Sequence, residues 1–329
     1  NFYLFFMKTK SISFIFPGQG SQKVGMGKDL YDQHKEAKMV FDLVDESLDQ
    51  RLSHLIFNGP ESELQLTSNA QPALMAVSIA IIKILECELN KPITDFVETV
   101  LGHSLGEYSS LCSVNSIDLE STAKILRIRG NAMQNAVKNL DTRMIAVIGL
   151  NLDKIEKELD KLKNQTDFKC EIANDNCPGQ VILSGIKESV NLVSDRLKDI
   201  GARSIVDLKV SAPFHCFLMK PASDIMKSAL SSVAIEAPKT KFISNVSANY
   251  EKDPKNIKDK LVEQVCKRVR WRESIIKVSS SQNIKKLIEI GSGKVLTGLN
   301  RRMKINQEHF NVSTMEDIQS FIDSFGDNL

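Results

Sequence analysis

The sequence predicts an α/β fold in which a smaller α/β unit is inserted into a larger one. Short apolar runs alternate with longer amphipathic segments along most of the 329 residues, as expected where strands alternate with helices. Over residues 141–210 the predicted order of elements is βαββαβ, the split βαβ pattern of a ferredoxin-like unit. We therefore expect residues 7–140 and 211–310 to form one discontinuous domain, with residues 141–210 as an inserted subdomain.

The larger domain is predicted to begin with a buried strand. The segment "SISFIFPG" (11–18) is a short apolar run that ends in a Pro-Gly turn, and "FVETVLG" (96–102) is a second run of this kind. Apolar residues recur at helical spacing in the segments that follow these strands. The remaining predicted elements are helices over 37–58, 72–90 and 117–138 and, after the insert, strands near 241–246 and 286–290.

The inserted subdomain is predicted to contain four strands and two charged helices. The segments "CEIAN" (170–174) and "QVILSG" (180–185) predict two strands joined by an Asn-Cys-Pro-Gly turn. The other elements are a strand over 144–150, a helix over 152–163, a helix over 187–201 and a strand over 203–210.

The composition is that of an ordinary globular protein, with 42% hydrophobic and 26% charged residues. The net charge of +2 indicates no nucleic-acid or membrane partner, and no apolar run approaches the ~20 residues of a membrane-spanning helix. Six scattered cysteines without a CxxC pair indicate a reducing compartment, so we expect a cytoplasmic protein without a metal site. Residues 1–6, ahead of Met7, are interpreted as a non-native or upstream extension.

The segment Gly102-His103-Ser104-Leu105-Gly106 matches the G-x-S-x-G nucleophile elbow and stands between a predicted strand and a predicted helix. In such a turn the serine has a strained backbone and an exposed Oγ, while small neighbours let the strand and the helix approach each other. The N–H groups of the helix N-terminus face the developing negative charge. Ser104 is therefore a candidate nucleophile; the alternative is a glycine-flanked turn that only caps a helix.

A serine nucleophile needs a base, and the sequence contains five histidines. His215 follows a predicted strand and a proline turn, where a catalytic loop would lie, so it is the preferred base. The alternative is a structural histidine. His103 is adjacent to Ser104 and is expected to point away from it. The other three are expected at the solvated surface, for His34 and His309, or in helix packing, for His54.

Two further segments have the composition of a binding site. Arg127 and Arg129 lie two positions apart on a predicted helix and so point to different faces. An inward guanidinium beside an acyl-transferring serine would hold a substrate carboxylate; the alternative is a surface arginine. The segment "FPGQGSQKVGMG" (16–27) has Lys23 where the G-x-G-x-x-G pattern needs glycine. It predicts a loop that brings backbone or glutamine amides to another site.

Six segments occur in a fixed order along the chain: "FIFPGQGSQ", "GHSLGEYSSL", "RIRGNAMQ", "ANDNCPGQVILSG", "SAPFHCFLMKPA" and "IEIGSGKVLTGLNRR". Together they resemble the bacterial malonyl-CoA:acyl carrier protein transacylases of type II fatty-acid synthesis, over essentially the whole chain from Ser11 to Arg302. The resemblance implies an α/β-hydrolase-like core with a ferredoxin-like subdomain, a monomer, and no bound cofactor, because malonyl-CoA is a substrate. It implies holo acyl carrier protein as the acyl acceptor.

The resemblance also implies roles for individual residues. Ser104 would take the malonyl group from coenzyme A as an ester. His215 would be the general base, oriented by the main-chain carbonyl of Gln264. Arg129 would pair with the malonyl carboxylate, whereas Arg127 does not match that position.

Three more residues follow from the same resemblance. The side chain of Gln19 and the backbone N–H of Leu105 would form the oxyanion hole. Phe214 would crowd an α-substituent on the acyl group and so favour malonyl. The basic runs 266–272 and 301–304 would dock the acidic carrier protein; the alternative is a solvated charged face.

Three other functions stay open on the sequence. A serine esterase or lipase shares the elbow but needs an acidic triad member and does not need Arg129. An acyltransferase of a polyketide or polyunsaturated-lipid assembly line has the same motifs and a different partner. A catalytically inactive carrier-binding subunit is disfavoured by the presence of Ser104, His215, Arg129 and Gln19.

Overall fold

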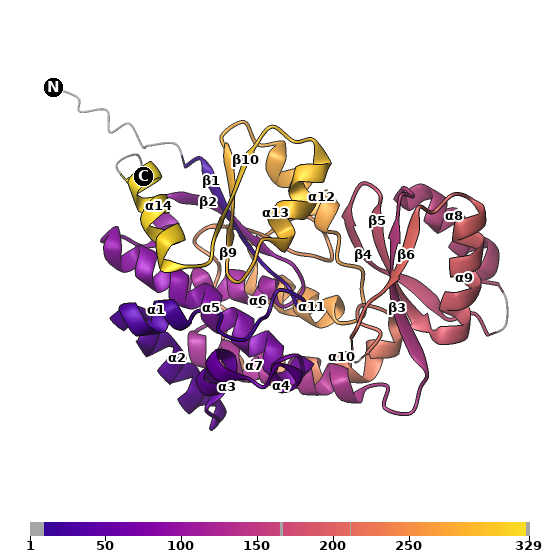
Figure 1. Cartoon of the computed structure of the whole chain (residues 1–329), viewed down its shortest axis with the longest axis horizontal. Coiled ribbons are helices and arrows are strands. Elements are labelled where there is room, and N and C mark those ends of the chain that lie inside the picture. Colours follow the sequence, from indigo (N-terminus) through magenta and orange to yellow (C-terminus); the bar gives the residue numbers. More distant parts are fainter. Residues whose placement is uncertain (1–9, 165–166, 211, 327–329) are drawn as a thin grey trace.

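Two β-sheets organise the chain in the computed structural model, which describes residues 10–164, 167–210 and 212–326 (Figure 1). The larger sheet consists, in spatial order, of β10 (Glu308–Val312), β9 (Lys286–Ile290), β1 (Ile12–Phe16), β2 (Val97–Gly102), β7 (Lys241–Ile243) and β8 (Tyr250–Glu251). The smaller sheet consists of β4 (Cys170–Cys177), β5 (Gln180–Ile186), β3 (Thr142–Ile148) and β6 (Ser204–Asp207). The larger sheet is parallel except for the β7–β8 pair, and the smaller is antiparallel. The predicted α/β class is confirmed.

The larger sheet is covered on both faces. Phe14 and Phe16 of β1 pack into one hydrophobic cluster, whereas Ile15 between them packs into a second cluster. Successive side chains of a strand point to opposite faces, so these two clusters lie on opposite sides of the sheet. Burial on both faces explains why the β1 sequence "ISFIF" is apolar without interruption.

The helices divide between these two faces (Figure 1). The first cluster is formed with α1 (Lys28–Gln33), α2 (Lys35–Leu48), α3 (Leu52–Asn58), α4 (Glu61–Leu64), α5 (Thr67–Glu88), α6 (Gly106–Ser113), α7 (Leu119–Asn135), α10 (Lys220–Ser231), α11 (Pro254–Gln264) and α14 (Met315–Phe325). The second cluster is formed with α12 (Trp271–Ser279) and α13 (Val295–Asn300). Short 3₁₀ turns lie at Ile93–Asp95, Phe217–Met219 and Arg301–Met303.

One prediction about apolar runs is wrong. Helix α5 is long and apolar enough to cross a membrane by length and composition, although the sequence was expected to contain no such run. Most of this helix is buried inside the protein, where it packs against α2 and α7. A core helix that is covered on all sides has the same composition as a spanning helix.

Several predicted elements differ in extent from the observed ones. The helix expected over 37–58 is two helices, because Asp49 adopts a left-handed conformation with φ of 46° and ends α2. The helix expected from residue 72 begins five residues earlier, at Thr67, so Pro72 lies inside it and cannot donate the hydrogen bond that the Ser68 carbonyl would accept. The strand expected over 203–210 covers only Ser204–Asp207. The interpretation of residues 1–6 lies outside the described residues.

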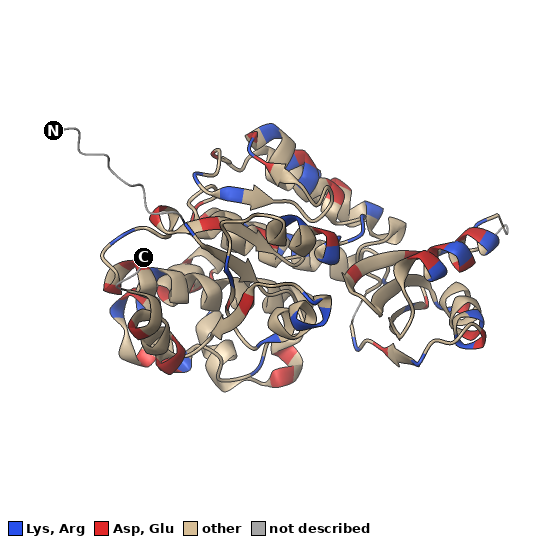
Figure 2. Ribbon diagram, turned by 90° about the horizontal axis from the view of Figure 1, so that it is seen from above, with Lys and Arg blue, Asp and Glu red and all other residues tan. Residues whose placement is uncertain are grey.

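The smaller sheet carries α8 (Leu152–Leu162) and α9 (Lys187–Asp199), which share a separate hydrophobic cluster with it. Lys and Arg alternate with Asp and Glu along these two helices (Figure 2), and several of them form ion pairs within one helix. Strand β4 joins the smaller sheet to the rest of the chain, because Asp175 N donates to Val269 O at 2.9 Å and Val269 N donates to Ala173 O at 2.8 Å. An ion pair of 2.8 Å between Arg272 and Asp175 reinforces this junction.

The register of the larger sheet determines where loops meet. Phe16 at the end of β1 pairs with Gly102 at the end of β2, and Leu101 of β2 pairs with Ile243 of β7. The loops that follow these three parallel strands therefore leave from one edge of the sheet. In open α/β sheets this carboxyl edge is where ligands bind.

Candidate active site

Ser104 lies on a sharp turn between β2 and α6, and the strand, turn and helix predicted around it are present. Its backbone is left-handed, with φ of 55°, and its N–H donates to Asn245 Oδ1 at 2.8 Å. A Cβ on Gly102 would lie 2.0 Å from the Gly106 carbonyl, and a Cβ on Gly106 would lie 2.2 Å from Phe16 O. Glycine is therefore required at both positions, because β2, α6 and the neighbouring strand β1 approach one another too closely for a side chain.

His215 reaches this serine from 111 residues further along the chain. Its Nε2 lies 2.8 Å from Ser104 Oγ, and its Nδ1 lies 2.8 Å from the backbone carbonyl of Gln264. Because a carbonyl only accepts, Nδ1 carries the ring proton and Nε2 is left as the acceptor for the Ser104 hydroxyl. This is the arrangement that a serine needs to lose its proton.

The electrostatic surroundings keep the His215 ring neutral. The side chain is 4% exposed, and burial, together with the nearby positive charge of Arg129, lowers its pKa to about 3. At neutral pH the imidazole is therefore in the form that accepts a proton. The hydrogen bond to the carbonyl of Gln264 favours a higher pKa of His215, because it stabilises the protonated ring.

Arg129 projects from α7 toward the same serine and is 1% exposed. Its Nη2 donates to Ser104 Oγ at 3.2 Å and to Gln264 Oε1 at 2.7 Å, and its Nη1 donates to Gln71 Oε1 at 2.7 Å. Its guanidinium also lies over the ring of Tyr108, 5.6 Å from the centroid. Among the described residues no carboxylate forms an ion pair with it; the neutral amides of Gln71 and Gln264 hold the cation in place, and its charge stays available to an anion.

The structure resolves which of the two neighbouring arginines points inward. Arg127 lies on the outer side of α7, where it donates to Asn69 Oδ1 at 2.6 Å and to Gln50 Oε1 at 2.5 Å. Its side chain is partly buried against these two residues and forms no hydrogen bond with the serine among the described residues. The alternative that Arg129 is a surface residue is therefore wrong.

A cavity of about 250 Å³ opens at the serine. The predicted site residues that line it are Gln19, Ser104, Leu105, Arg129, Phe214 and His215. Gln19 Nε2 donates to Thr67 Oγ1 at 3.3 Å, and Leu105 is the N-cap residue of α6. Gln264 does not line the cavity, but both its backbone and its side chain contact residues that do.

Sequence reasoning missed three polar residues around the serine. Glu107 is 0% exposed and accepts a hydrogen bond from Gln264 Nε2 at 2.5 Å. Burial raises its pKa to about 7, against the opposing hydrogen bonds of Gln264, Ser244 and Asn245. An acid in the first turn of a helix is ordinary, so position alone did not distinguish it. Asn245 and Gln71 carry no sequence signal; Asn245 is brought in by the turn that follows β7, and Gln71 by α5.

The remaining histidines lie away from the serine hydroxyl. His103 Nε2 is 2.9 Å from Asn176 Oδ1 and its ring packs near Trp271, so it points toward β4; the expectation that it points away from the Ser104 hydroxyl is met. His54 is exposed, so the expectation of packing is wrong. His309 lies half-buried in β10 and His34 is the half-buried N-cap of α2, so neither is fully solvated.

The described residues contain one group of side chains with the donor types of a metal site, formed by His34, Cys87 and Glu88 within 4.8 Å of one another. His34 Nδ1 accepts the backbone N–H of Glu36 at 3.2 Å, which places the ring proton on Nε2, facing Glu88 at 3.1 Å. A metal bound at Nε2 would move the ring proton to Nδ1. A protonated Nδ1 could no longer accept the hydrogen bond from the backbone N–H of Glu36. The group is better explained as a helix cap.

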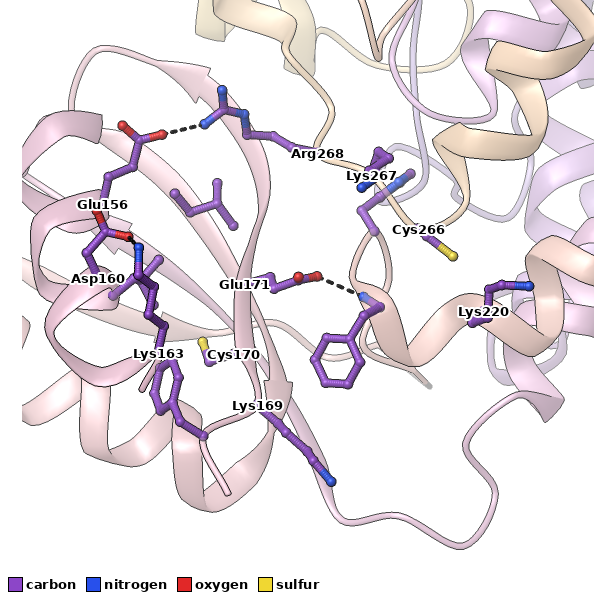
Figure 3. A pocket seen from close by; sticks show the side chains of 15 residues that line it. Glu156, Asp160, Lys163, Lys169, Cys170, Glu171, Lys220, Cys266, Lys267 and Arg268 are labelled. Atoms are coloured by element: carbon purple, nitrogen blue, oxygen red, sulfur yellow. Dashed lines mark hydrogen bonds and ion pairs between the residues drawn. The ribbon is translucent and has the colours of Figure 1, made fainter. Parts of the chain in front are cut away.

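Residues 266–268 of the basic run 266–272 line a second cavity, of about 1230 Å³, between the smaller sheet and α10 (Figure 3). Figure 3 shows Arg268 paired with Glu156 across this cavity, at 2.8 Å. Arg270 pairs with Glu273 at 2.6 Å, so much of the positive charge of the run is neutralised within the chain. Lys267 is exposed. Carrier-protein docking at this run stays a prediction.

Comparison with known proteins decides the family. The acyl transferase domain family matches residues 13–308. The malonyl CoA-acyl carrier protein transacylase of Bacillus subtilis is 42% identical over 298 residues, which are 89% of this chain and 92% of that protein. The chain is an acyltransferase of the malonyl CoA-acyl carrier protein transacylase family. The Staphylococcus aureus transacylase is 36% identical over 93% of this chain and 97% of its own length.

Solved structures of transacylases share the whole fold. The acyl-carrier-protein S-malonyltransferase of Bartonella henselae superposes with a TM-score of 0.92 at 46% identity, covering 96% of this chain and 99% of that chain. A malonyl-transacylase in complex with a type II polyketide-synthase acyl-carrier protein superposes with a TM-score of 0.90 at 33% identity, covering 95% and 99%. The acyltransferase fold thus extends over both sheets of this chain.

Proposed function

We propose that this acyltransferase moves malonyl from malonyl-CoA to the phosphopantetheine thiol of a holo acyl carrier protein, through a malonyl ester on Ser104, in fatty-acid synthesis. The observation that carries the proposal is Arg129, a buried cation held by neutral amides with its Nη2 3.2 Å from the serine Oγ. A malonyl thioester has a carboxylate two bonds from its reactive carbonyl, so a cation beside the nucleophile selects and orients it. The names of the relatives support the same substrates.

In the first half-reaction Ser104 Oγ attacks the thioester carbonyl carbon while its proton passes to His215 Nε2. The neutral ring of His215 is already 2.8 Å from Oγ, and the Gln264 carbonyl supports the imidazolium that forms. Arg129 Nη2 donates to Oγ in the free enzyme, and the malonyl carboxylate replaces Oγ as its acceptor. The substrate therefore releases the nucleophile as it binds.

The tetrahedral intermediate places negative charge on the former carbonyl oxygen. The backbone N–H of Leu105, at the N-terminus of α6, and the side chain of Gln19 are the proposed donors, since both residues line the cavity at Ser104. Losing one such donor costs roughly 10²–10³ in rate. The carbon–sulfur bond then breaks, His215 returns its proton to the coenzyme A thiolate, and malonyl-Ser104 remains. The carrier thiol attacks this ester by the same steps in reverse, and no resident cofactor is needed.

Phe214 is proposed to limit the size of the acyl group. Its side chain is 8% exposed and lines the cavity together with Met133 and Met144. A malonyl group has hydrogens at its α-carbon, whereas an α-methyl group would need space against this aromatic ring. The selectivity of this position rests on shape rather than on charge.

We also propose that the fold divides into a hydrolase-like core and an inserted ferredoxin-like subdomain. The order β4-β5-β3-β6, with α8 after β3 and α9 after β5, supports a ferredoxin-like subdomain over 141–210. The parallel sheet with the serine elbow after β2 supports an α/β-hydrolase-like core over 7–140 and 211–310. We extend that core to Phe325, because β10 pairs with β9 and α14 packs on Phe14. A monomer in the cytoplasm remains our expectation.

The partner of His215 Nδ1 argues against the esterase alternative. A hydrolase triad needs a carboxylate there, and the partner is the backbone carbonyl of Gln264. The proposal is tested by intact-mass spectrometry after incubation with malonyl-CoA, with and without holo acyl carrier protein. We expect one malonyl group on the enzyme, none on Ser104→Ala, and its transfer to the carrier. An enzyme that gains no malonyl mass, or gains it equally with Ser104→Ala, would refute the proposal.

A further inference from the structure

Glu107 is a buried carboxylate for which the steps above have no use. It lies in the first turn of α6, three residues after Ser104, and is 0% exposed. Among the described residues its side chain forms no hydrogen bond with Ser104 Oγ or with His215; its partner is Gln264, at 2.5 Å. A carboxylate kept out of water at this cost calls for a role in the surrounding network.

Gln264 connects this carboxylate to the reacting groups. Its backbone carbonyl accepts from His215 Nδ1 at 2.8 Å, and its side-chain Oε1 accepts from Arg129 Nη2 at 2.7 Å. Its Nε2 donates both to Ser104 O, at 2.9 Å, and to Glu107 Oε2. The amide oxygen and both amide hydrogens are therefore all in use.

The two ends of a glutamine amide differ only in hydrogen-bond polarity, and Glu107 determines which end faces Arg129. If the amide of Gln264 were reversed, its Nε2 would face the Nη2 donor of Arg129, and its Oε1 would face two acceptors, the Ser104 carbonyl and the Glu107 carboxylate. A carboxylate accepts hydrogen bonds and never donates them when ionised, so it excludes the reversed orientation more strongly than the carbonyl does.

The negative charge of Glu107 also compensates the positive charge of Arg129 without occupying the N–H groups of the guanidinium. Glu107 and Arg129 attract each other, but one amide separates them, so the guanidinium keeps its hydrogen bonds for the substrate. A carboxylate in direct contact would compete with malonyl for the same N–H groups. The other carboxylate oxygen, Oε1, has no hydrogen-bond partner among the described residues, although Ser244 and the Asn245 backbone are near enough to favour the ionised form of Glu107.

We propose that Glu107 is a positioning residue for malonyl selection, which acts through the Gln264 amide to hold Arg129 toward the acyl carboxylate. The inference rests on the proposed function. Glu107→Gln replaces the acceptor-only carboxylate by an amide of the same shape. An amide at position 107 can present either its oxygen or its NH₂ group to the Gln264 side chain, so the orientation of Gln264 is no longer enforced.

The test compares two reactions of the same serine at pH 8, where the carboxylate form of Glu107 prevails. Malonyl transfer from malonyl-CoA depends on Arg129, whereas p-nitrophenyl acetate, a neutral ester, uses the same serine, base and oxyanion donors but has no carboxylate for Arg129 to bind. We expect Glu107→Gln to lower kcat/KM for malonyl-CoA by roughly 10- to 100-fold and to change the p-nitrophenyl acetate rate by less than about threefold. In the Arg129→Ala background the same substitution should have no further effect on malonyl transfer.

The matched control is Glu289→Gln, which neutralises a second fully buried carboxylate that accepts from Leu296 N and Thr297 N, outside the site. It should leave the ratio of the two rates unchanged. An equal loss of both reactions in Glu107→Gln, or an unchanged ratio, would overturn the proposal. If Glu107→Gln does not fold, Glu107→Asp keeps the acceptor-only character and should retain a malonyl preference above that of Arg129→Ala; a preference equal to that of Arg129→Ala would overturn it. A wild-type enzyme that is not malonylated refutes the proposed function instead.

Discussion

The charge of Arg129 is the feature on which acyl-group selection depends, and Arg129→Ala tests it. The substitution removes a buried cation and leaves two acceptors, Gln71 Oε1 and Gln264 Oε1, without their donor. It also deprives the malonyl carboxylate of its partner, a guanidinium that is only 1% exposed. Removing one partner of a buried ion pair costs about 3–5 kcal/mol. At 1.36 kcal/mol per tenfold, malonyl transfer should fall by roughly 10²- to 10⁴-fold in kcat/KM.

Uncharged acyl groups should respond differently to the same substitution. The positive charge of Arg129 lowers the pKa of His215, and its Nη2 occupies a lone pair of Ser104 Oγ. Removing both effects makes the base stronger and the nucleophile less restrained, so acetyl transfer should be unchanged or faster. The expected result is thus a reversal of preference rather than a general loss of activity.

The assay measures transfer of malonyl and of acetyl from their coenzyme A thioesters to holo acyl carrier protein, with thermal unfolding to establish that the variant is folded. Arg127→Ala is the matched control, because it removes an arginine from the same helix whose hydrogen bonds, within the part of the chain that the structure describes, go to Asn69 and Gln50. It should leave the malonyl-to-acetyl ratio unchanged. Equal losses of both acyl groups in a folded Arg129→Ala enzyme would refute the assignment of a carboxylate clamp.

Three further outcomes follow from the structure. The His215 ring should show no protonation between pH 5 and 8 in an NMR titration, because its pKa is lowered to about 3; a midpoint near 6.5 would contradict its burial. Since the unfolded chain takes up that proton at about pH 6.5, the contribution of His215 to stability is complete above this pH and is lost as the pH falls toward 3, which chemical denaturation at several pH values will measure. Gly106→Ala should fail to fold or lose several kcal/mol of stability, because its Cβ would lie 2.2 Å from Phe16 O; a wild-type melting temperature would show that the elbow can relax.

The sequence alone determined the features that depend on residues close together in the chain, namely the serine elbow and the alternation of strands and helices. Gly102, Ser104 and Gly106 specify the elbow because a left-handed serine between a strand and a helix leaves no space for a side chain two residues before it or two residues after it. Alternating apolar and amphipathic segments likewise predicted the α/β class. The break after α2 was missed, because it depends on the left-handed conformation of Asp49 alone while the apolar spacing continues across it.

The tertiary structure decided how distant groups meet. Helical periodicity places Arg127 and Arg129 on different faces but does not say which face is buried; that follows from packing of α7 against α5. The contact between Ser104 and His215 and the network of Glu107, Gln264 and Arg129 join α6, α7, α11 and a loop that are far apart in the chain. Buried polar side chains take whichever partners the fold brings within hydrogen-bonding distance, so their roles exist only once the helices have packed.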